Sequence, residues 1–172
     1  AEECDIISFH TPLIKEGIYK TFHLADNDFF RQLKKRPYII NTSRGEVIDT
    51  QAILTALNER TISGAVIAVW ENEPDINREL LDKVFIGTPH IAGYSADGKA
   101  NATRMVLEAY CRFFGKEMNF KIAPTETPHV AYDSNEEIRI LQQYNPHRDC
   151  EALRAHPERF EQLRGDYPLR RE

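Results

Sequence analysis

The sequence has few cysteines, no long apolar run and no excess of positive charge, and each shortage excludes a class of protein. Cys4, Cys111 and Cys150 are odd in number and form no C-x-x-C pair, so neither a disulfide framework nor a metal site is expected. No stretch approaches the ~20 consecutive apolar residues of a membrane helix. The net charge of −5 offers no general attraction for nucleic acid or for an anionic membrane.

What is present indicates an ordinary globular chain. Its 172 residues are enough for one domain with a buried core. Hydrophobic residues make up 41% and charged residues 28% of the sequence, which is typical of soluble proteins. Unpaired cysteines favour a reducing compartment. We therefore expect a cytoplasmic protein whose partner is a small molecule.

Four short apolar runs, rich in Ile and Val, predict strands that are buried on both faces, as in a parallel sheet. Each run is closed by polar or turn-forming residues. The runs cover residues 4–9, 38–41, 63–70 and 84–86.

Helical patterns lie between and after these runs. Residues 50–60 and 77–83 predict two helices that precede the third and fourth apolar runs. The longest pattern covers residues 95–114, and Gly115 stands where a left-handed C-cap is expected. The alternation of strands and helices predicts a doubly wound α/β sheet.

A polar side chain follows each predicted strand: His10, Arg44, Glu73 and His90. In an open parallel sheet, ligands bind outside the carboxyl ends of the strands, where such loops converge. Taken singly, each of these residues is more often a structural or surface residue than a catalytic one. Delivered together to one edge, they form a recognisable chemical set.

This set suits the oxidation of a 2-hydroxy acid. The planar fork of Arg44 can hold a carboxylate through two parallel hydrogen bonds. His90 can accept the hydroxyl proton, and a carboxylate such as Glu73 beside it favours the imidazolium form and fixes which ring nitrogen carries the proton. The remaining requirement is a hydride acceptor, which points to a nicotinamide cofactor.

Four motifs between residues 9 and 95 resemble the successive signatures of the D-isomer-specific 2-hydroxyacid dehydrogenases. They read FHTPL (9–13), INTSRGEVID (40–49), VWENEP (69–74) and GTPHIAGYS (87–95). The resemblance implies that Arg44 binds the substrate carboxylate, that Glu73 is the acidic partner and that His90 is the catalytic acid and base. It also implies that NAD is the cofactor. The positions expected to line the cofactor are His10, Thr11, Pro12, Thr42, Ser43, Ala68, His90, Ala92 and Gly93.

Within the family, the phrases HTPLIKEGIYKTFHLAD and GTPHIAGYSADGKANAT are similar to members that act on a phosphorylated four-carbon 2-hydroxy acid and form homodimers. The fold expected on this basis has three parts. Residues 1–96 form the second half of a Rossmann-type dinucleotide-binding domain, residues 97–117 a long helix, and residues 118–172 part of a C-terminal α+β dimerisation domain. Arg170 and Arg171 are predicted to attract the substrate phosphate.

Two features depart from the family pattern. Ala68 replaces the aspartate that members usually carry, and no G-x-G-x-x-G loop is present. That loop brings a helix N-terminus to the pyrophosphate, and without the acidic residue that follows it the sequence does not distinguish NAD from NADP. We therefore expect an inactive fragment of a longer enzyme. Two alternatives stay open: another 2-hydroxyacid dehydrogenase, for glycerate or 3-phosphoglycerate, and a non-catalytic dimerisation or regulatory module.

Overall fold

The computed structural model describes residues 1–126 and 133–170, and these divide into two compact units. The first unit consists of Ala1–Ile91 and Pro146–Asp166. The second consists of the described residues of Ala92–Asn145 and Tyr167–Glu172. The predicted residue Arg171 lies outside the described residues.

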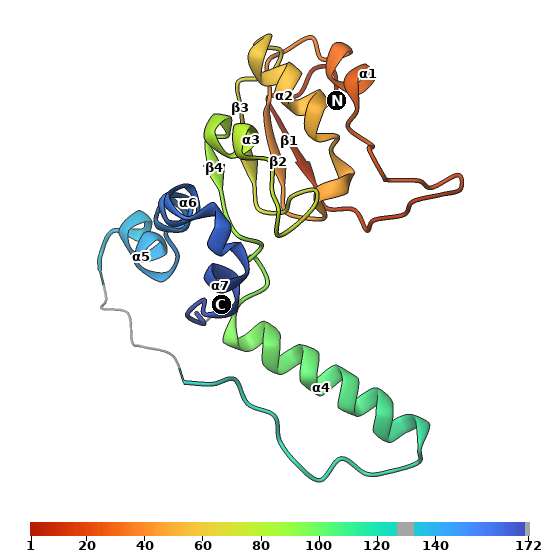
Figure 1. Cartoon of the computed structure of the whole chain (residues 1–172). Helices are drawn as coiled ribbons and strands as arrows, with labels where there is room; N and C mark the ends of the chain where they lie inside the picture. Colours follow the sequence, from red (N-terminus) through yellow and green to blue (C-terminus); the bar gives the residue numbers. More distant parts are fainter. Residues whose placement is uncertain (127–132, 171–172) are drawn as a thin grey trace. The chain divides into compact units, whose positions relative to one another are not determined.

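The first unit is built on a parallel sheet of four strands in the order β1-β2-β3-β4 (Figure 1). The strands are Ile6–Phe9 (β1), Tyr38–Asn41 (β2), Gly64–Ile67 (β3) and Ile86–Gly87 (β4). All three neighbouring pairs are parallel. The predicted parallel α/β sheet is therefore confirmed, although three of the four strands are shorter than the apolar runs that predicted them.

Helices connect these strands, and each begins at a polar cap. They are Asn27–Arg31 (α1), Thr50–Asn58 (α2) and Arg78–Lys83 (α3), with a 3-10 turn at Gly45–Val47. The side chains of Asp26, Asp49 and Asn77 accept hydrogen bonds from backbone N–H groups in the first turns of α1, α2 and α3. Such caps satisfy N–H groups that have no partner within the helix. The sequence predicted α2 and α3, but not α1.

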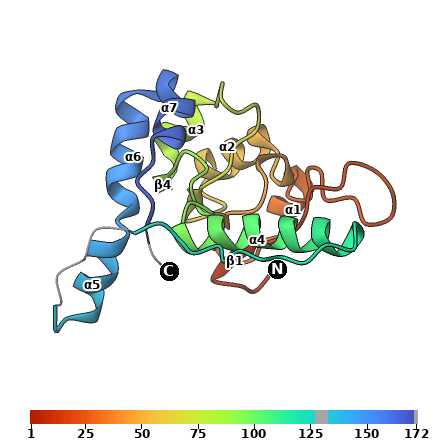
Figure 2. The same ribbon diagram turned by 90° about the horizontal axis from the view of Figure 1, so that it is seen from below.

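The core of the first unit also includes residues from the end of the chain. Helices Pro146–Ala155 (α6) and Phe160–Gly165 (α7), joined by a 3-10 turn at Pro157–Arg159, bring Leu153 and Phe160 into this core, where both are fully buried. The Gly87 N–H of β4 donates to Cys150 Sγ across 3.3 Å, and the ribbon of α6 lies beside β4 (Figure 2). Residues 146–166 belong to the first compact unit together with the sheet. The domain boundaries at residues 96 and 117 stay a prediction.

The second unit contains the long helix Ala96–Phe113 (α4) and the helix Glu136–Gln143 (α5). Ser95 caps α4, and Gly115 has a φ of +61°, as expected for the predicted left-handed C-cap. Within the described part of residues 118–170, helices form but no extended strand does, and Arg170 makes only an isolated bridge with Ser95. Among the described helices, none is long and apolar enough to cross a membrane.

Candidate active site

The loops that follow the four strands carry most of the predicted site residues. The strands end at Phe9, Asn41, Ile67 and Gly87 and run in one direction, so their loops lie at one edge of the sheet. The structure places at this edge His10, Thr11, Pro12, Thr42, Ser43, Arg44, Ala68, Glu73 and His90.

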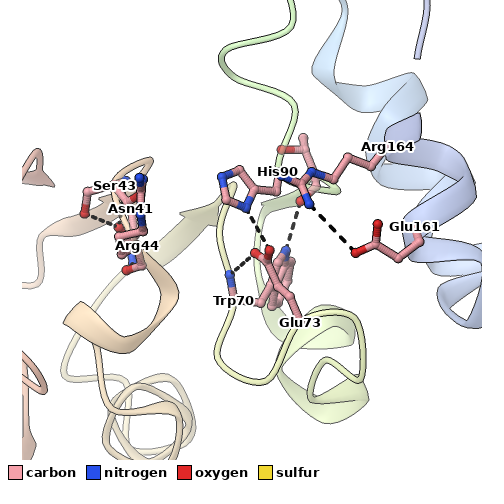
Figure 3. A network of polar contacts seen from close by, with 9 residues as sticks. Asn41, Ser43, Arg44, Trp70, Glu73, His90, Glu161 and Arg164 are labelled. Carbon is pink, nitrogen blue, oxygen red and sulfur yellow. Dashed lines mark hydrogen bonds and ion pairs between the residues drawn. The ribbon is translucent and has the colours of Figure 1, made fainter. Parts of the chain in front are cut away.

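His90 and Glu73 are in direct contact. His90 Nδ1 lies 2.7 Å from Glu73 Oε2, and both side chains are largely buried (Figure 3). The other carboxylate oxygen of Glu73 accepts a hydrogen bond from the backbone N–H of Trp70 across 2.9 Å. A carboxylate can only accept, so it favours the proton on Nδ1 and leaves Nε2 to exchange a proton with a ligand.

Trp70 connects the loops that carry these two residues. Its backbone N–H holds Glu73, and its indole Nε1 donates to the backbone oxygen of Thr88 across 2.9 Å, two residues before His90. The ring is 4% exposed and packs over Gly87, where a Cβ atom would lie 2.8 Å from the ring. The indole thus fixes the end of β3 relative to the end of β4.

Gly45 brings the loop after β2 against the same tryptophan. A Cβ atom at this position would lie 2.0 Å from both the carbonyl carbon and the carbonyl oxygen of Trp70. No side chain can be accommodated there, because the neighbouring atoms are backbone. Because Gly45 has no side chain, its backbone can contact the backbone of Trp70, which lies between β3 and Glu73.

Asn41 shapes the loop that presents Arg44. Its side chain is almost fully buried, and Oδ1 accepts hydrogen bonds from the backbone N–H and the hydroxyl of Ser43 at 3.1 and 2.9 Å. Nδ2 donates to the backbone oxygen of Arg44 across 2.9 Å. The Arg44 side chain is exposed, and its Nη1 donates to the Ser43 backbone oxygen. Asn41 therefore fixes the backbone of this loop and leaves the guanidinium at the surface.

The loop after β1 leaves one polar atom without a partner. His10 is exposed, and its Nε2 lies 2.7 Å from Ser8 Oγ. Thr11 Oγ1 is buried and has no hydrogen-bond partner in the described structure. The Pro12 backbone oxygen accepts a hydrogen bond from the Thr21 hydroxyl. Since a buried hydroxyl without a partner is costly, Thr11 is suited to bond a ligand at this edge.

Three further predicted residues lie in the second unit. Arg170 Nη2 donates to the Ala92 backbone oxygen across 3.0 Å, and the guanidinium stacks 4.4 Å from the ring centre of Tyr144. Arg170 Nη1 is buried without a hydrogen-bond partner among the described residues. Among the described residues, apart from the chain neighbours of Gly93, none lies within 4 Å of the position of a Cβ atom on this glycine. Arg170, Ala92 and Gly93 are therefore close in this unit.

In the part of the chain that the structure describes, Arg44 does not contact the other two predicted catalytic residues through polar interactions. Within the described residues, no hydrogen bond or ion pair connects Arg44 with Glu73 or His90. Nor does any cluster of three or more His, Cys, Asp or Glu residues in the described chain form a possible metal site. The chemistry available is that of a carboxylate–histidine pair, with an exposed guanidinium in the loop after β2 at the same edge of the sheet.

Comparison with known proteins identifies the family. The family model for the NAD-binding domain of D-isomer specific 2-hydroxyacid dehydrogenases matches residues 1–92. The chain belongs to this family. The resemblance inferred from the four motifs is thereby confirmed.

Individual members of this dehydrogenase family match over much of the chain. Erythronate-4-phosphate dehydrogenase of Bacteroides thetaiotaomicron is 63% identical over 174 residues, which cover 100% of this chain and 50% of that protein. The holo structure of Rhodotorula graminis D-mandelate dehydrogenase has a TM-score of 0.60 and 30% identity over 73% of this chain and 37% of that one. Aquifex aeolicus D-lactate dehydrogenase, complexed with NAD and lactic acid, has a TM-score of 0.55 and 29% identity, and the match covers 72% of this chain and 43% of that one. The chain thus spans about half the length of the curated relative.

Sequence reasoning missed two residues that shape the site of this family member. Asn41 lay at the end of a predicted strand, where a buried amide has no distinguishing pattern. Trp70 is the only tryptophan in the sequence, and its position between two proposed loops could have marked it as a packing centre. The hydrogen bond from the Trp70 indole to Thr88 is not visible from spacing, since it joins residues that are 18 positions apart.

The packing of Gly45 gives a testable prediction. Gly45→Ala should lower the free energy of unfolding by about 3 kcal/mol or more, because the added methyl group collides with backbone rather than with a mobile side chain. Gly165→Ala is the matched control, since no other part of the described structure lies within 4 Å of the position of a Cβ atom there. Urea unfolding compares the two variants, and equal stabilities would contradict the close contact with Trp70.

Proposed function

We propose that this protein catalyses the NAD-dependent oxidation of a phosphorylated D-2-hydroxy acid. The favoured reaction is 4-phospho-D-erythronate to 2-oxo-3-hydroxy-4-phosphobutanoate, a step of pyridoxal 5′-phosphate biosynthesis. The observation that carries the proposal is the 2.7 Å contact between His90 Nδ1 and Glu73 Oε2 at the edge that also bears Arg44. The name and 63% identity of the Bacteroides relative support the choice of substrate.

His90 moves the proton in this reaction. Its Nε2 accepts the hydroxyl proton of the substrate as the C2–H bond breaks, and it returns that proton in the reverse direction. Glu73 holds the Nδ1 proton and stabilises the imidazolium that forms, as an orienting carboxylate does in other histidine-based sites. When bound, NAD supplies the acceptor for the hydride that leaves C2.

Arg44 orients the substrate. Its side chain is exposed at the sheet edge, and within the described structure Nη1 is the only guanidinium nitrogen that makes a hydrogen bond, to the Ser43 backbone oxygen. The other donors of the fork are available for a carboxylate, which they would hold in one orientation. We propose that a carboxylate held in this way presents the adjacent C2 hydroxyl to His90, which follows β4 at the same edge of the sheet.

The loops fit a dinucleotide at the same edge. Thr11 offers a buried hydroxyl without a partner, and Ala68 is a small buried residue at the end of β3 whose N–H is bonded to the Asn41 backbone oxygen. We propose that residues 10–12, Thr42, Ser43 and Ala68 of the first unit contact the cofactor. For Ala92 and Gly93 the proposal rests on the family resemblance alone. Ala68 supplies no carboxylate, so this contact with NAD is limited to its methyl group and backbone.

The phosphate of the substrate requires a further cation. Arg170 has a guanidinium nitrogen without a hydrogen-bond partner and is held beside the Ala92 backbone. We propose that Arg170 attracts the phosphate, with Arg171 as a second cation. We also propose a homodimer and a cytoplasmic location, which the family resemblance and the three free cysteines support.

A chimeric enzyme tests the proposed reaction. The 172 residues of this chain replace the aligned half of the Bacteroides relative. The reduction of NAD by the chimera is then followed with 4-phospho-D-erythronate as substrate. His90→Ala should lower kcat about 10²- to 10⁴-fold, as expected for loss of a general base. His156→Ala changes an exposed histidine and should leave kcat unaltered. An inactive chimera, or greater activity with glycerate or 3-phosphoglycerate, would reject the proposed substrate.

The paired N–H donors of the Arg44 guanidinium lead to a second prediction for the chimera. Arg44→Lys keeps the charge but loses the paired donors, so kcat/KM should fall about tenfold or more. Arg31→Lys, at an exposed position of α1, serves as the control. If lysine at position 44 supports the same kcat/KM as arginine, only the charge of this residue matters.

A further inference from the structure

A second histidine, His23, lies between two carboxylates in the first unit. Its Nε2 is 2.7 Å from Glu71 Oε1, and its Nδ1 is 3.2 Å from Asp49 Oδ2. One face of the imidazole stacks on the Phe22 ring, with 3.9 Å between the ring centres. All three polar side chains are less than one third exposed. The ring is therefore fixed through both nitrogens and one face.

The two carboxylates anchor this histidine to the start of α2. Glu71 Oε2 accepts a hydrogen bond from the backbone N–H of Thr50, the first residue of α2, across 2.9 Å. Asp49 caps the same helix by accepting from the Ala52 backbone N–H across 2.8 Å. His23 itself lies in the segment between β1 and α1. The cluster thus joins three separate parts of the chain: that segment, the start of α2 and the turn after β3.

The turn after β3 also carries Glu73. Glu71 and Glu73 are separated by Asn72, which has a left-handed φ of +59°. Glu71 binds His23 and Thr50, whereas Glu73 binds the Trp70 N–H and His90. The turn is therefore held at both ends, by the carboxylates of Glu71 and Glu73. If the contacts of Glu71 are lost, the position of Glu73 is less constrained.

We propose that His23 is a positioning residue for the Glu73–His90 pair. By holding Glu71, His23 keeps the turn from Trp70 to Glu73 in the geometry that places Glu73 Oε2 against His90 Nδ1. His23 does not touch the reacting atoms. The effect of His23 on kcat rests on the proposed dehydrogenase function. Its effect on which ring nitrogen of His90 carries the proton does not.

Two substitutions separate this role from a general contribution to stability. In His23→Gln the terminal amide nitrogen extends toward the position of Nε2, so it can still donate to Glu71. In His23→Asn the shorter amide corresponds to Nδ1 and can reach only Asp49. Each variant loses one of the two contacts, but only the asparagine variant loses the contact with Glu71.

Nuclear magnetic resonance of the histidine rings measures the effect directly. In the ¹⁵N-labelled 172-residue chain, His90 should carry its proton on Nδ1, bonded to Glu73. The ¹⁵N signals of His90 that report a proton on Nδ1 should be retained in His23→Gln and lost in His23→Asn. His156→Asn is the matched control, because His156 is an exposed histidine that also lies beside a glutamate, Glu158, and it should leave the His90 signals unchanged.

Glu71→Gln provides a second variant in case His23→Asn does not fold. A carboxylate accepts hydrogen bonds from both His23 and Thr50, whereas an amide presents an acceptor on one side and a donor on the other. One of the two anchors is then lost, and the His90 signature should be lost with it. Unchanged His90 signals in folded His23→Asn or Glu71→Gln would overturn the proposal, as would equal loss in His23→Gln and His23→Asn.

Kinetics of the chimera add a second readout. His23→Asn should lower kcat about 10- to 100-fold through misplacement of the catalytic pair, with little change in KM, and His23→Gln should recover most of the rate. A change confined to KM would contradict a positioning role. A chimera that is inactive without any substitution rejects the proposed function, whereas the resonance experiment still decides the role of His23.

Discussion

The contact between Glu73 and His90 depends on one buried side chain, Trp70. Its backbone N–H holds the carboxylate and its indole holds the Thr88 backbone oxygen, so a single residue fixes both partners. Gly45 and Gly87 allow close packing against it. Proton transfer needs a histidine with a defined tautomer and position, and this packing supplies both.

Two of the four described non-glycine residues with a positive φ belong to this part of the structure. His90 and Asn72 both adopt a positive φ, at +55° and +59°, a conformation that is unfavourable for residues other than glycine. The surrounding contacts hold these residues there: His90 by Glu73, and the turn containing Asn72 by Glu71 and Glu73. Part of the packing energy of the first unit therefore maintains the geometry of the candidate site rather than adding to stability.

The sequence predicted the local elements well because short apolar runs and capping residues are local signals. It also predicted His90 and Glu73 as partners, since both follow strands of one parallel sheet. It did not reveal Asn41, whose contacts with Ser43 and Arg44 are local but follow no motif that was recognised. It also missed Trp70 and His23, whose roles come from contacts with residues far apart in the chain. Helices α6 and α7 were missed for the same reason: Leu153 and Phe160 lie in a polar stretch, and only tertiary packing makes them part of the core.

The central claim is that the Glu73–His90 pair removes the hydroxyl proton while the hydrogen on C2 leaves as hydride. The most direct measurement follows deuterium from C2 of labelled 4-phospho-D-erythronate in the chimera and in its Glu73→Gln variant. The account predicts one deuterium in the NADH formed, with slower transfer in the variant. NADH without deuterium, or an unchanged transfer rate in Glu73→Gln, would contradict it.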